Sequence, residues 1–342
     1  RTLRRILVTG GAGFIGSNFV RYLLAHRNYE VVNFDKLTYA GNLDNLRDVE
    51  NHARYRFVQG DICDADAVEG AMDGVDGVVN FAAETHVDRS LIAAGAFIQT
   101  DVHGVFVLLE AARRHGVERV LHISTDEVYG PRFPEAPARE DDSFAPVNPY
   151  AASKAGGEMQ CQAFFRTYGL PVIVSRSANN IGPYQYPEKA VPLFVTNALD
   201  DQPLPVYGEG LQVRDRLYVE DNCEALDLIL HEGIPGESYN VGAENERSNI
   251  EVAETILRLL GKPRSLIRFV EDRTRHDARY SLDTSKLHQL GWQPRHPYDA
   301  AMEKTVAWYR DNRWWWEKIK SGEYATYYRR QYADRLAHAR SL

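Results

Sequence analysis

Two groups of side chains able to do acid–base chemistry lie near the middle of the chain. Thr125, Asp126 and Glu127 form the first group, and Tyr150 and Lys154 form the second. Tyr150 and Lys154 are four residues apart, so on a helix they share one face. An ammonium favours a nearby phenolate, and we therefore expect Lys154 to lower the pKa of Tyr150 from its usual value of about 10. Such a phenolate can take a proton from a sugar hydroxyl while a hydride leaves the same carbon. An isolated Tyr-x-x-x-Lys match is more often an ordinary surface pair on a helix, so the catalytic interpretation depends on other motifs in the chain.

The elements around these residues predict a parallel α/β sheet. The apolar run 119–123 is expected to be a buried strand ending just before Thr125, and Tyr150 and Lys154 lie on a helix that runs to about Tyr168. Strands and helices alternate over residues 1–177, which implies right-handed crossovers. Ligands of such sheets bind at the carboxyl ends of the strands, where Thr125 to Glu127 lie.

A glycine-rich turn near the N-terminus predicts a dinucleotide site. Residues 5–9 read as a strand, Gly10, Gly13 and Gly16 follow it, and an amphipathic helix is expected from Phe14 to His26. Glycine permits a tight turn and lets backbone N–H groups approach a pyrophosphate at a helix N-terminus. The strand-turn-helix context favours cofactor binding over a purely structural turn, with Phe14 and Ile15 beside the cofactor.

The following strands end in residues that suit the rest of a dinucleotide. Asp35 closes the strand 30–34 about 20 residues beyond the glycines, where an acidic residue takes the ribose hydroxyls of NAD. Its charge would repel the 2′-phosphate of NADP, so we expect a preference for NAD, although the neighbouring Lys36 weakens this expectation. The alternative role for Asp35 is a structural cap at the end of the strand. Asp61 and Ile62 close the strand 55–58 and are placed near the adenine. Ala82 lies in a predicted apolar strand, 78–83.

These segments predict two parts. A doubly wound parallel-sheet Rossmann domain is expected over residues 1–178, with segments near 217–242 returning to it. A smaller α/β substrate domain and a C-terminal helical tail are expected over residues 179–342. Its predicted elements include a helix at 192–200, a capping box from Ser248 to Glu251 that opens a helix ending near Gly261, and one or two surface helices at 318–342. One long helix is expected at 93–115, and Trp314 to Trp316 are interpreted as packing residues.

Bulk properties narrow the function classes. The chain has 342 residues, 44% of them hydrophobic, which is ample for a core. A formal net charge of -8 argues against a general nucleic-acid binder. Cys63, Cys161 and Cys223 are scattered, so we expect no disulfide framework and no metal site, and a cytoplasmic location. No apolar stretch reaches the length of a membrane span.

Basic and polar residues in the second half suggest where a sugar nucleotide would bind. Arg214 and Arg279 are interpreted as diphosphate ligands, because guanidinium forks match phosphate oxygens. The segment 276–280 is a polar cluster whose members could equally be solvated.

Several motifs together resemble the extended short-chain dehydrogenase/reductase family, and within it the nucleoside-diphosphoglucose 4,6-dehydratases. The resemblance runs from about Val8 to Trp316 and is carried by the segments 8–16, 35–42, 86–90, 125–130 and 187–189 together with Tyr150 and Lys154. The Asp-Glu pair after Thr125 is its most specific part. The sequence departs from the family pattern at Ile181, Ala190 and Arg216.

The resemblance implies a role for each catalytic residue. Tyr150 takes the proton of the sugar 4-hydroxyl, Lys154 supports Tyr150 and holds the nicotinamide ribose, and Thr125 hydrogen-bonds the oxygen at C4. Glu127 then removes the C5 proton, and a protonated Asp126 gives its proton to the departing 6-hydroxyl. NAD+ is regenerated in each turnover and is expected to stay tightly bound.

The resemblance also implies a substrate site and an assembly. The substrate is a sugar nucleotide of the dTDP-glucose type, and the residues expected to line its site are His86, Asn179, Glu188, Lys189, Arg214, Asn249, His276 and Tyr280. A homodimer is expected, with the helices near 93–115 and 150–168 pairing across a two-fold axis. Neither nucleic acid nor membrane is an expected partner.

Two alternatives stay open at this point. Another NAD-dependent sugar-nucleotide enzyme, a 4-epimerase or a decarboxylase, shares the oxidation at C4, but an epimerase has no need of Asp126 and Glu127 for water loss. A non-catalytic NAD-sensing protein would typically lack the Tyr or the Lys, and both are present.

Overall fold

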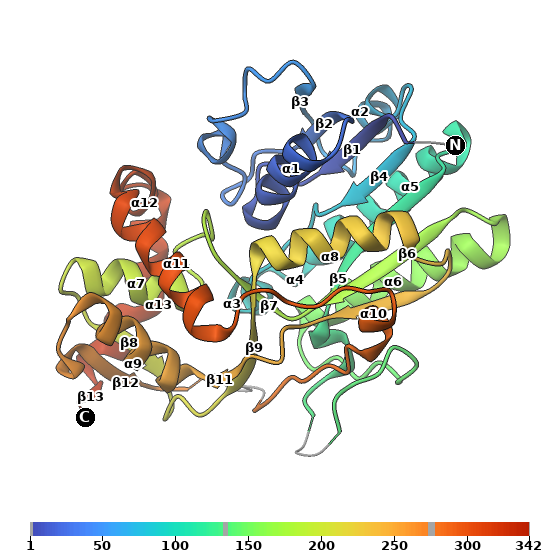
Figure 1. Ribbon diagram of the computed structural model, residues 1–342. Coiled ribbons are helices and arrows are strands. Elements are labelled where there is room, and N and C mark those ends of the chain that lie inside the picture. The colour runs from blue at the N-terminus through green and yellow to red at the C-terminus, as the bar shows by residue number, and fades with distance from the viewer. Residues whose placement is uncertain (1–2, 133–135, 273–277, 342) are drawn as a thin grey trace.

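A seven-stranded parallel sheet organises the N-terminal part of the computed structural model, which describes residues 3–132, 136–272 and 278–341 (Figure 1). Its strand order is β10-β6-β5-β4-β1-β2-β3. The bounds are β1 (Arg5–Thr9), β2 (Glu30–Asp35), β3 (Tyr55–Gln59), β4 (Gly77–Asn80), β5 (Arg119–Thr125), β6 (Val172–Ser177) and β10 (Ser238–Val241). Because β1 pairs with both β2 and β4, the order of strands reverses there, and this is where such sheets bind ligands. The predicted α/β parallel-sheet fold is therefore confirmed.

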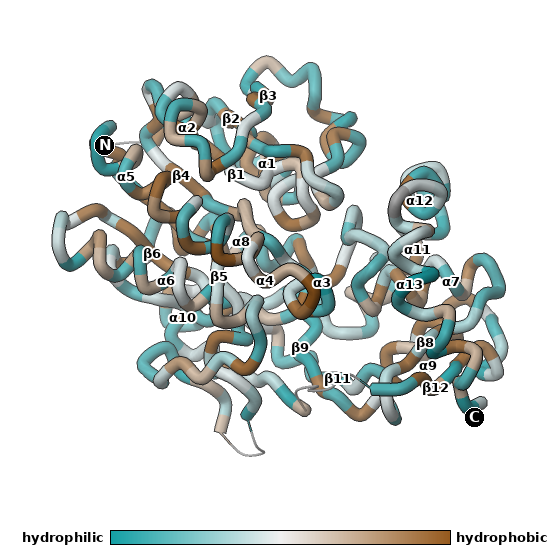
Figure 2. The backbone as a smooth tube through the Cα atoms, turned by 180° about the vertical axis from the view of Figure 1, so that it is seen from behind, coloured by the Kyte–Doolittle hydropathy of each residue, from teal (hydrophilic) through white to brown (hydrophobic). Residues whose placement is uncertain are grey.

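Helices cover both faces of this sheet. One face carries α1 (Phe14–His26) and α8 (Val219–Glu232), and the other carries α2 (Ala65–Ala71), α5 (Val105–His115) and α6 (Pro149–Tyr168). Two apolar clusters fill the layers between helices and strands, and the brown stretches of β4 and α8 in Figure 2 belong to them. A sheet buried on both faces explains why its strands read as continuous apolar runs.

The C-terminal part is built around two small sheets and a third apolar cluster. One sheet joins β11 (Glu246–Ser248), β9 (Val213–Tyr218) and β7 (Asn179–Ile181), and the other joins β13 (Arg340–Ser341), β12 (Ile267–Val270) and β8 (Leu204–Tyr207). The helices α7 (Ala190–Leu199), α9 (Asn249–Leu260) and α11 (Tyr298–Asp311) pack around them. A short helix, α10 (Ser285–Gln289), precedes α11.

The chain returns to the large sheet before it ends. The strand β10 pairs with β6, and α8 packs on α1. This path agrees with the expectation for residues 217–242, while the division into two domains at residue 178 stays a proposal. No helix in the described part of the chain is long and apolar enough to cross a membrane.

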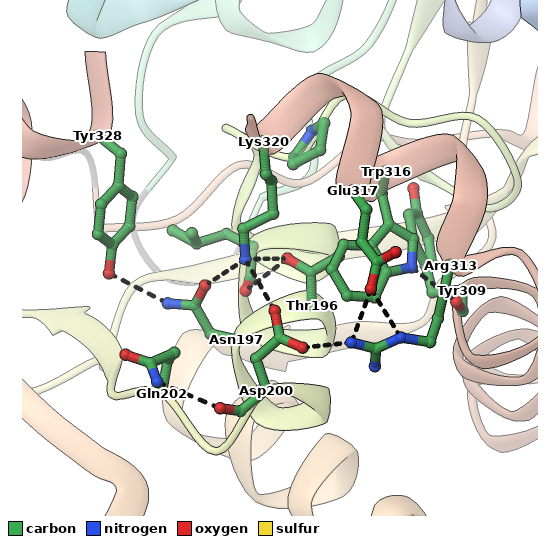
Figure 3. Close-up of polar contacts among 12 residues, drawn as sticks. Thr196, Asn197, Asp200, Gln202, Tyr309, Arg313, Trp316, Glu317, Lys320 and Tyr328 are labelled. Carbon is green, nitrogen blue, oxygen red and sulfur yellow. Dashed lines mark hydrogen bonds and ion pairs between the residues drawn. The ribbon is translucent and has the colours of Figure 1, made fainter. Parts of the chain in front are cut away.

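The C-terminal tail forms α12 (Arg313–Lys320) and α13 (Glu323–Ala337), and it is less superficial than predicted. Trp315, Trp316, Tyr324 and Tyr332 are all buried. Figure 3 shows how charged and amide groups fasten these helices to α7: Lys320 Nζ donates to Asn197 Oδ1 at 3.0 Å, and Arg313 pairs with Asp200 at 2.6 Å. An aromatic-rich tail is buried here because α7 and β8 leave an apolar face for it.

Two predicted elements have different bounds in the structure. The fourth strand was expected at 78–83 but ends at Asn80, because residues 81–82 pass against the glycine turn instead of continuing the ladder. The helix expected at 93–115 is divided into α4 (Ala94–Ile98), a π-helical segment (Gln99–Gly104) and α5. A further short helix, α3 (Val87–Ile92), precedes them.

Candidate active site

A cavity of about 300 Å³ opens at the carboxyl ends of β1, β2, β4 and β5. It continues into a second hollow of about 170 Å³ between the two parts of the chain. Glu127, Asn179, Glu188 and Lys189 line both, so the two form one elongated site. All twelve residues predicted to contact the cofactor line the larger cavity: Gly10, Gly13, Phe14, Ile15, Gly16, Asp35, Lys36, Asp61, Ile62, Ala82, Tyr150 and Lys154.

The glycine turn is shaped by close backbone approach. Gly10 has φ of 66°, and a Cβ there would lie 2.6 Å from Ala82 N, so no larger residue fits. The N–H of Gly13 donates to Gly10 O at 3.1 Å, and α1 begins at Phe14. The turn therefore presents the N-terminus of a 13-residue helix to the cavity, where a phosphate would be stabilised.

Asp35 ties the end of β2 to this turn. Its Oδ2 accepts a hydrogen bond from Ala12 N at 2.9 Å and its Oδ1 accepts one from Leu37 N at 2.8 Å. Lys36 pairs with Asp61 at 2.6 Å across the neighbouring strand end. The Lys36 ammonium is thus engaged by a carboxylate, which reduces its ability to attract the 2′-phosphate of NADP.

The predicted catalytic residues Thr125, Asp126 and Glu127 lie where β5 passes into a short 3-10 turn, Asp126–Tyr129. Thr125 Oγ1 accepts from Glu127 N at 3.3 Å and donates to Asp126 Oδ1 at 3.2 Å. These contacts hold the two carboxyls in different surroundings: Asp126 is 3% exposed, whereas Glu127 is half-buried.

Burial raises the pKa of Asp126 to about 7, with a further contribution from the neighbouring Glu127 carboxylate. Arg214 and the hydrogen bond from Thr125 act in the opposite direction but do not cancel the rise. A carboxyl that is half protonated at neutral pH can act as a general acid.

Tyr150 and Lys154 occupy the first turns of α6, but the predicted effect of Lys154 differs from what the structure gives. Burial, and then the Glu127 carboxylate, raise the pKa of Tyr150 well above its usual value. The Lys154 ammonium donates to Ile123 O at 2.6 Å, and burial lowers its own pKa. The chain's own groups therefore keep Tyr150 protonated, and the lowering expected from Lys154 is not observed.

Asn148 is a site residue that sequence reasoning missed. Its Oδ1 caps α6 by accepting from Ala151 N at 2.8 Å, while its Nδ2 donates to Glu127 Oε2 at 3.1 Å. One side chain thus fixes both the helix that carries Tyr150 and the orientation of Glu127. An Asn before Pro at a helix start signals the cap. Its contact with Glu127 is long-range, so no local pattern indicates it.

The predicted substrate residues are mostly gathered in the second hollow. His86, Asn179, Glu188, Lys189, Arg214 and Asn249 line it. Tyr280 does not; it is buried behind Arg214, whose guanidinium lies 4.5 Å from the centre of its ring. His276 lies outside the described residues.

Ion pairs within the protein engage two further residues that were predicted to bind the substrate, Glu188 and Arg279. Glu188 is held by Arg89 at 3.0 Å and by the Tyr39 hydroxyl at 2.9 Å, so it belongs to a fixed polar network in the wall. Arg279 pairs with Glu246 at 2.8 Å and is not among the residues that line either hollow, so its role as a diphosphate ligand stays a prediction.

Two aromatic residues that line the second hollow were also missed. Tyr207 at the end of β8 and Tyr332 on α13 line it together with Pro205. Tyr332 comes from the tail, to which the sequence assigned no function, and only the packing of α13 brings it here. Among the described residues, no group of three His, Cys, Asp or Glu side chains is placed to hold a metal ion.

Comparisons with known proteins match most of the chain. A family model described as GDP-mannose 4,6-dehydratase matches residues 7–305. The dTDP-glucose 4,6-dehydratase of Streptomyces niveus is 52% identical over 328 residues, covering 94% of this chain and 97% of that protein.

Solved structures agree in fold. A double mutant of DesIV, a dTDP-glucose 4,6-dehydratase from Streptomyces venezuelae with NAD bound, is similar with a TM-score of 0.91 at 48% identity, covering 92% of this chain and 100% of that one. The UDP-glucose 4-epimerase of Thermus thermophilus, in complex with NAD, has a TM-score of 0.84 at 32% identity over 90% and 99% of the two chains.

Proposed function

This chain belongs to the GDP-mannose 4,6-dehydratase family, and from this membership we propose that it is a hydro-lyase, an NAD-dependent 4,6-dehydratase of dTDP-glucose. The reaction removes water from the sugar and gives a 4-keto-6-deoxy product. The observation that carries the proposal is the adjacent pair Asp126 and Glu127, which line one cavity with Tyr150. Elimination of water needs an acid and a base at the same place, and two carboxyls in different environments supply them.

The residues around the larger cavity fit a bound dinucleotide. The close-packed turn at Gly10 and the helix N-terminus beyond Gly13 suit the pyrophosphate, and the Asp35 carboxylate suits the ribose hydroxyls. Lys154 would hold the nicotinamide ribose. Bound NAD+ would supply the acceptor for the hydride of C4 and its donor at C6, so we expect the enzyme to retain it.

The chain's own residues handle the protons. Tyr150 takes the proton of the 4-hydroxyl, and Thr125 hydrogen-bonds the oxygen that becomes the 4-ketone. The ketone acidifies the C5 proton, because its removal gives an enolate, and Glu127 removes it. Asp126 gives its proton to the departing 6-hydroxyl, which leaves as water, and the C5 proton is later restored. The proton that Tyr150 gains balances the one that Asp126 loses, so the sugar loses one molecule of water in total.

A positive charge near the phenol is still required for the first step. The structure leaves the pKa of Tyr150 raised, because burial and Glu127 both oppose ionisation. The oxidised nicotinamide, which is cationic, would favour the phenolate if it were bound near Tyr150.

A homodimer and a reducing compartment complete the proposal. Large apolar side chains on the outer surface of α4, α5 and α6 support a dimer interface there: Ile98 is 54% exposed, Phe106 41%, Met159 46% and Tyr168 55%. Exposed apolar groups of this kind, gathered on neighbouring helices, are typical of an interface. The three unpaired cysteines support a reducing compartment such as the cytoplasm.

The activity is tested by incubating the protein with dTDP-glucose and measuring the alkaline ultraviolet absorbance of the keto sugar. Glu127→Gln should lower its formation by about 10²- to 10⁴-fold, the usual range for loss of a general base. Hydride transfer from C4 to the bound cofactor should persist in this variant, and the absorbance of the reduced nicotinamide would report it. Glu303→Gln on the exposed face of α11 is the matched control and should retain full activity.

The same assay decides against the alternatives. A 4-epimerase would form a stereoisomer of the substrate without any keto sugar, and an NAD-sensing protein would leave dTDP-glucose unchanged. If Glu127→Gln formed the keto sugar at the wild-type rate, the assignment of Glu127 as the base would be wrong. Product analysis with dTDP-, UDP-, GDP- and CDP-glucose tests the choice of nucleotide.

A further inference from the structure

A second arginine lies beside Arg214 in the hollow and has no role in the function proposed above. Arg214 and Arg216 are two residues apart on β9, so their side chains project from the same face of the strand, and both line the hollow. Asp215 projects to the opposite face, where its carboxylate accepts hydrogen bonds from Ala243 N and Asn245 N at 2.7 and 2.8 Å. The carboxylate nearest in sequence is therefore committed elsewhere.

Arg216 is buried with little compensation. The residue is 5% exposed. Its Nη2 donates to the neutral Asn249 Oδ1 at 2.8 Å, and its buried Nε has no hydrogen-bond partner among the described residues. Burial and then the charge of Arg214 lower its pKa to about 10, although Tyr298, Asp215 and Asp126 act in the opposite direction, so the guanidinium remains charged at neutral pH.

Such an arrangement is unfavourable unless an anion completes it. A buried ion without a close partner of opposite charge is strongly destabilising, and an unsatisfied buried donor adds to this. Two like charges on one strand face raise the cost further. A guanidinium presents its donors in a planar fork that matches phosphate oxygens.

The position of Arg216 along the site indicates which part of the substrate it meets. The end of the site nearest Asp126 and Tyr150 is where the sugar ring must react. Tyr207 and Tyr332 line the second hollow but not the larger cavity, and their rings are a surface suited to a base. A sugar nucleotide with its sugar near Asp126 and its base near these rings would have its diphosphate in the hollow that Arg214 and Arg216 line.

We propose that Arg216 binds the diphosphate of the sugar nucleotide together with Arg214, so that this substrate is held by two guanidinium groups from one strand. That the bound anion is a diphosphate rests on the function proposed above. Its alternative is a structural role, in which Arg216 only orients Asn249 at the start of α9.

Binding of thymidine diphosphate and of thymidine, measured by isothermal titration calorimetry on the intact protein, separates these roles. Arg216→Gln removes the charge and keeps a donor for Asn249. We expect it to weaken thymidine diphosphate binding about 10- to 100-fold, as for loss of a charge-assisted hydrogen bond, and to change thymidine binding less than about twofold. Arg216→Lys keeps the charge and should recover part of the loss.

Arg247→Gln is the matched control, because Arg247 lies on the neighbouring strand β11, is only half-buried and does not line the hollow. It should bind both ligands as the wild type does. The melting temperature of each variant shows whether it is folded. If Arg216→Gln does not fold, the binding measured with Arg216→Lys tests the proposal instead.

Unchanged thymidine diphosphate affinity in Arg216→Gln would overturn the proposal, as would an equal loss for thymidine. If wild-type protein forms the keto sugar while Arg216→Gln binds thymidine diphosphate normally, only this inference fails. If wild-type protein neither binds thymidine diphosphate nor forms the keto sugar, the proposed function fails with it.

Discussion

The carboxyl of Asp126 shows how neighbouring residues prepare one group for an acid's task. It lies at the end of a buried strand, directly before a half-buried Glu127 that repels its charge. The same two causes, burial and then Glu127, raise its pKa to about 7. Since like charges at short distance cannot both ionise readily, the proton is favoured on the more buried Asp126, which supports the proposed role of Glu127 as the base.

The pH dependence of dehydration follows from this. A raised pKa means that the protonated acid is present below about pH 7 and is lost above it. The rate of keto sugar formation should therefore fall about tenfold per pH unit between about pH 8 and about pH 9.5. Tyr150 does not account for such a fall, because its pKa is raised well above its usual value.

Asp126→Asn provides the control for that profile. It cannot donate a proton in the same way, so its rate should be at least about 10²-fold lower and independent of pH over this range. A wild-type rate that stays level from neutral pH to that alkaline limit would contradict the assignment of Asp126 as the acid.

Asn148 offers a test of how Glu127 is held. Asn148→Asp keeps a cap oxygen for Ala151 N but replaces the donor to Glu127 with a negative charge. Asp is as good an N-cap as Asn, so the melting temperature should change little. The new charge disfavours ionised Glu127, and the acidic limb of the pH–rate profile should move to higher pH. An unmoved limb with normal activity would show that the contact with Asn148 has no catalytic importance.

At the scale of elements, the C-terminal helices do more than cover the surface. Trp315 on α12 donates its Nε1 to Asn45 Oδ1 at 2.8 Å, and Asn45 in turn donates to Ala12 O at 2.8 Å in the glycine turn. A residue near the end of the chain thus supports the loop that begins the cofactor cavity. Its ring also packs on Trp308, with centroids 5.3 Å apart.

The two neighbouring tryptophans should differ sharply in their contribution to stability. Trp315 is 1% exposed and Trp314 is 45% exposed. Trp315→Ala should lower the free energy of unfolding by about 3–5 kcal/mol through the cavity it leaves. Trp314→Ala should lower it by less than about 1 kcal/mol. Thermal and urea denaturation measure both, and equal effects would refute the packing described for α12.

Elements with strong local signals were predictable from the sequence, and those defined by tertiary contact were not. The capping box at Ser248 and the glycine at 261 gave the bounds of α9 closely, because capping chemistry is local. The division of the helix expected at 93–115 was missed. Its π-helical segment packs closely on α6 near residues 101 and 157, which is a tertiary contact that no local pattern indicates.

The same distinction applies to the site. Residues at strand ends, such as Asp35 and Glu127, follow from the alternation of strands and helices. Tyr332 and the Asn148 contact depend on how distant segments pack, so they required the structure. The sign of the pKa shift at Tyr150 was also beyond the sequence, because it depends on burial and on Glu127 more than on Lys154.

At the scale of the whole molecule, the proposed dimer makes a further prediction. Met159 lies exposed on α6, within the apolar face formed with Phe106 of α5. Met159→Glu places a charge there without disturbing the core, so sedimentation velocity should show a species of 38.8 kDa in place of one twice that mass. Trp314→Glu, on a different surface, should remain dimeric. A wild-type protein that sediments as a monomer would contradict the proposed dimer.

The central claim is that the sugar is oxidised at C4, loses water across C5 and C6, and is reduced again at C6 within one site. The most direct test uses dTDP-glucose labelled with deuterium at C4, incubated with the wild-type protein in ordinary water and analysed by NMR and mass spectrometry. We expect a 4-keto-6-deoxy product that carries the deuterium in its C6 methyl group. A product whose methyl group lacks the label, or a product that keeps deuterium at C4, would contradict the account.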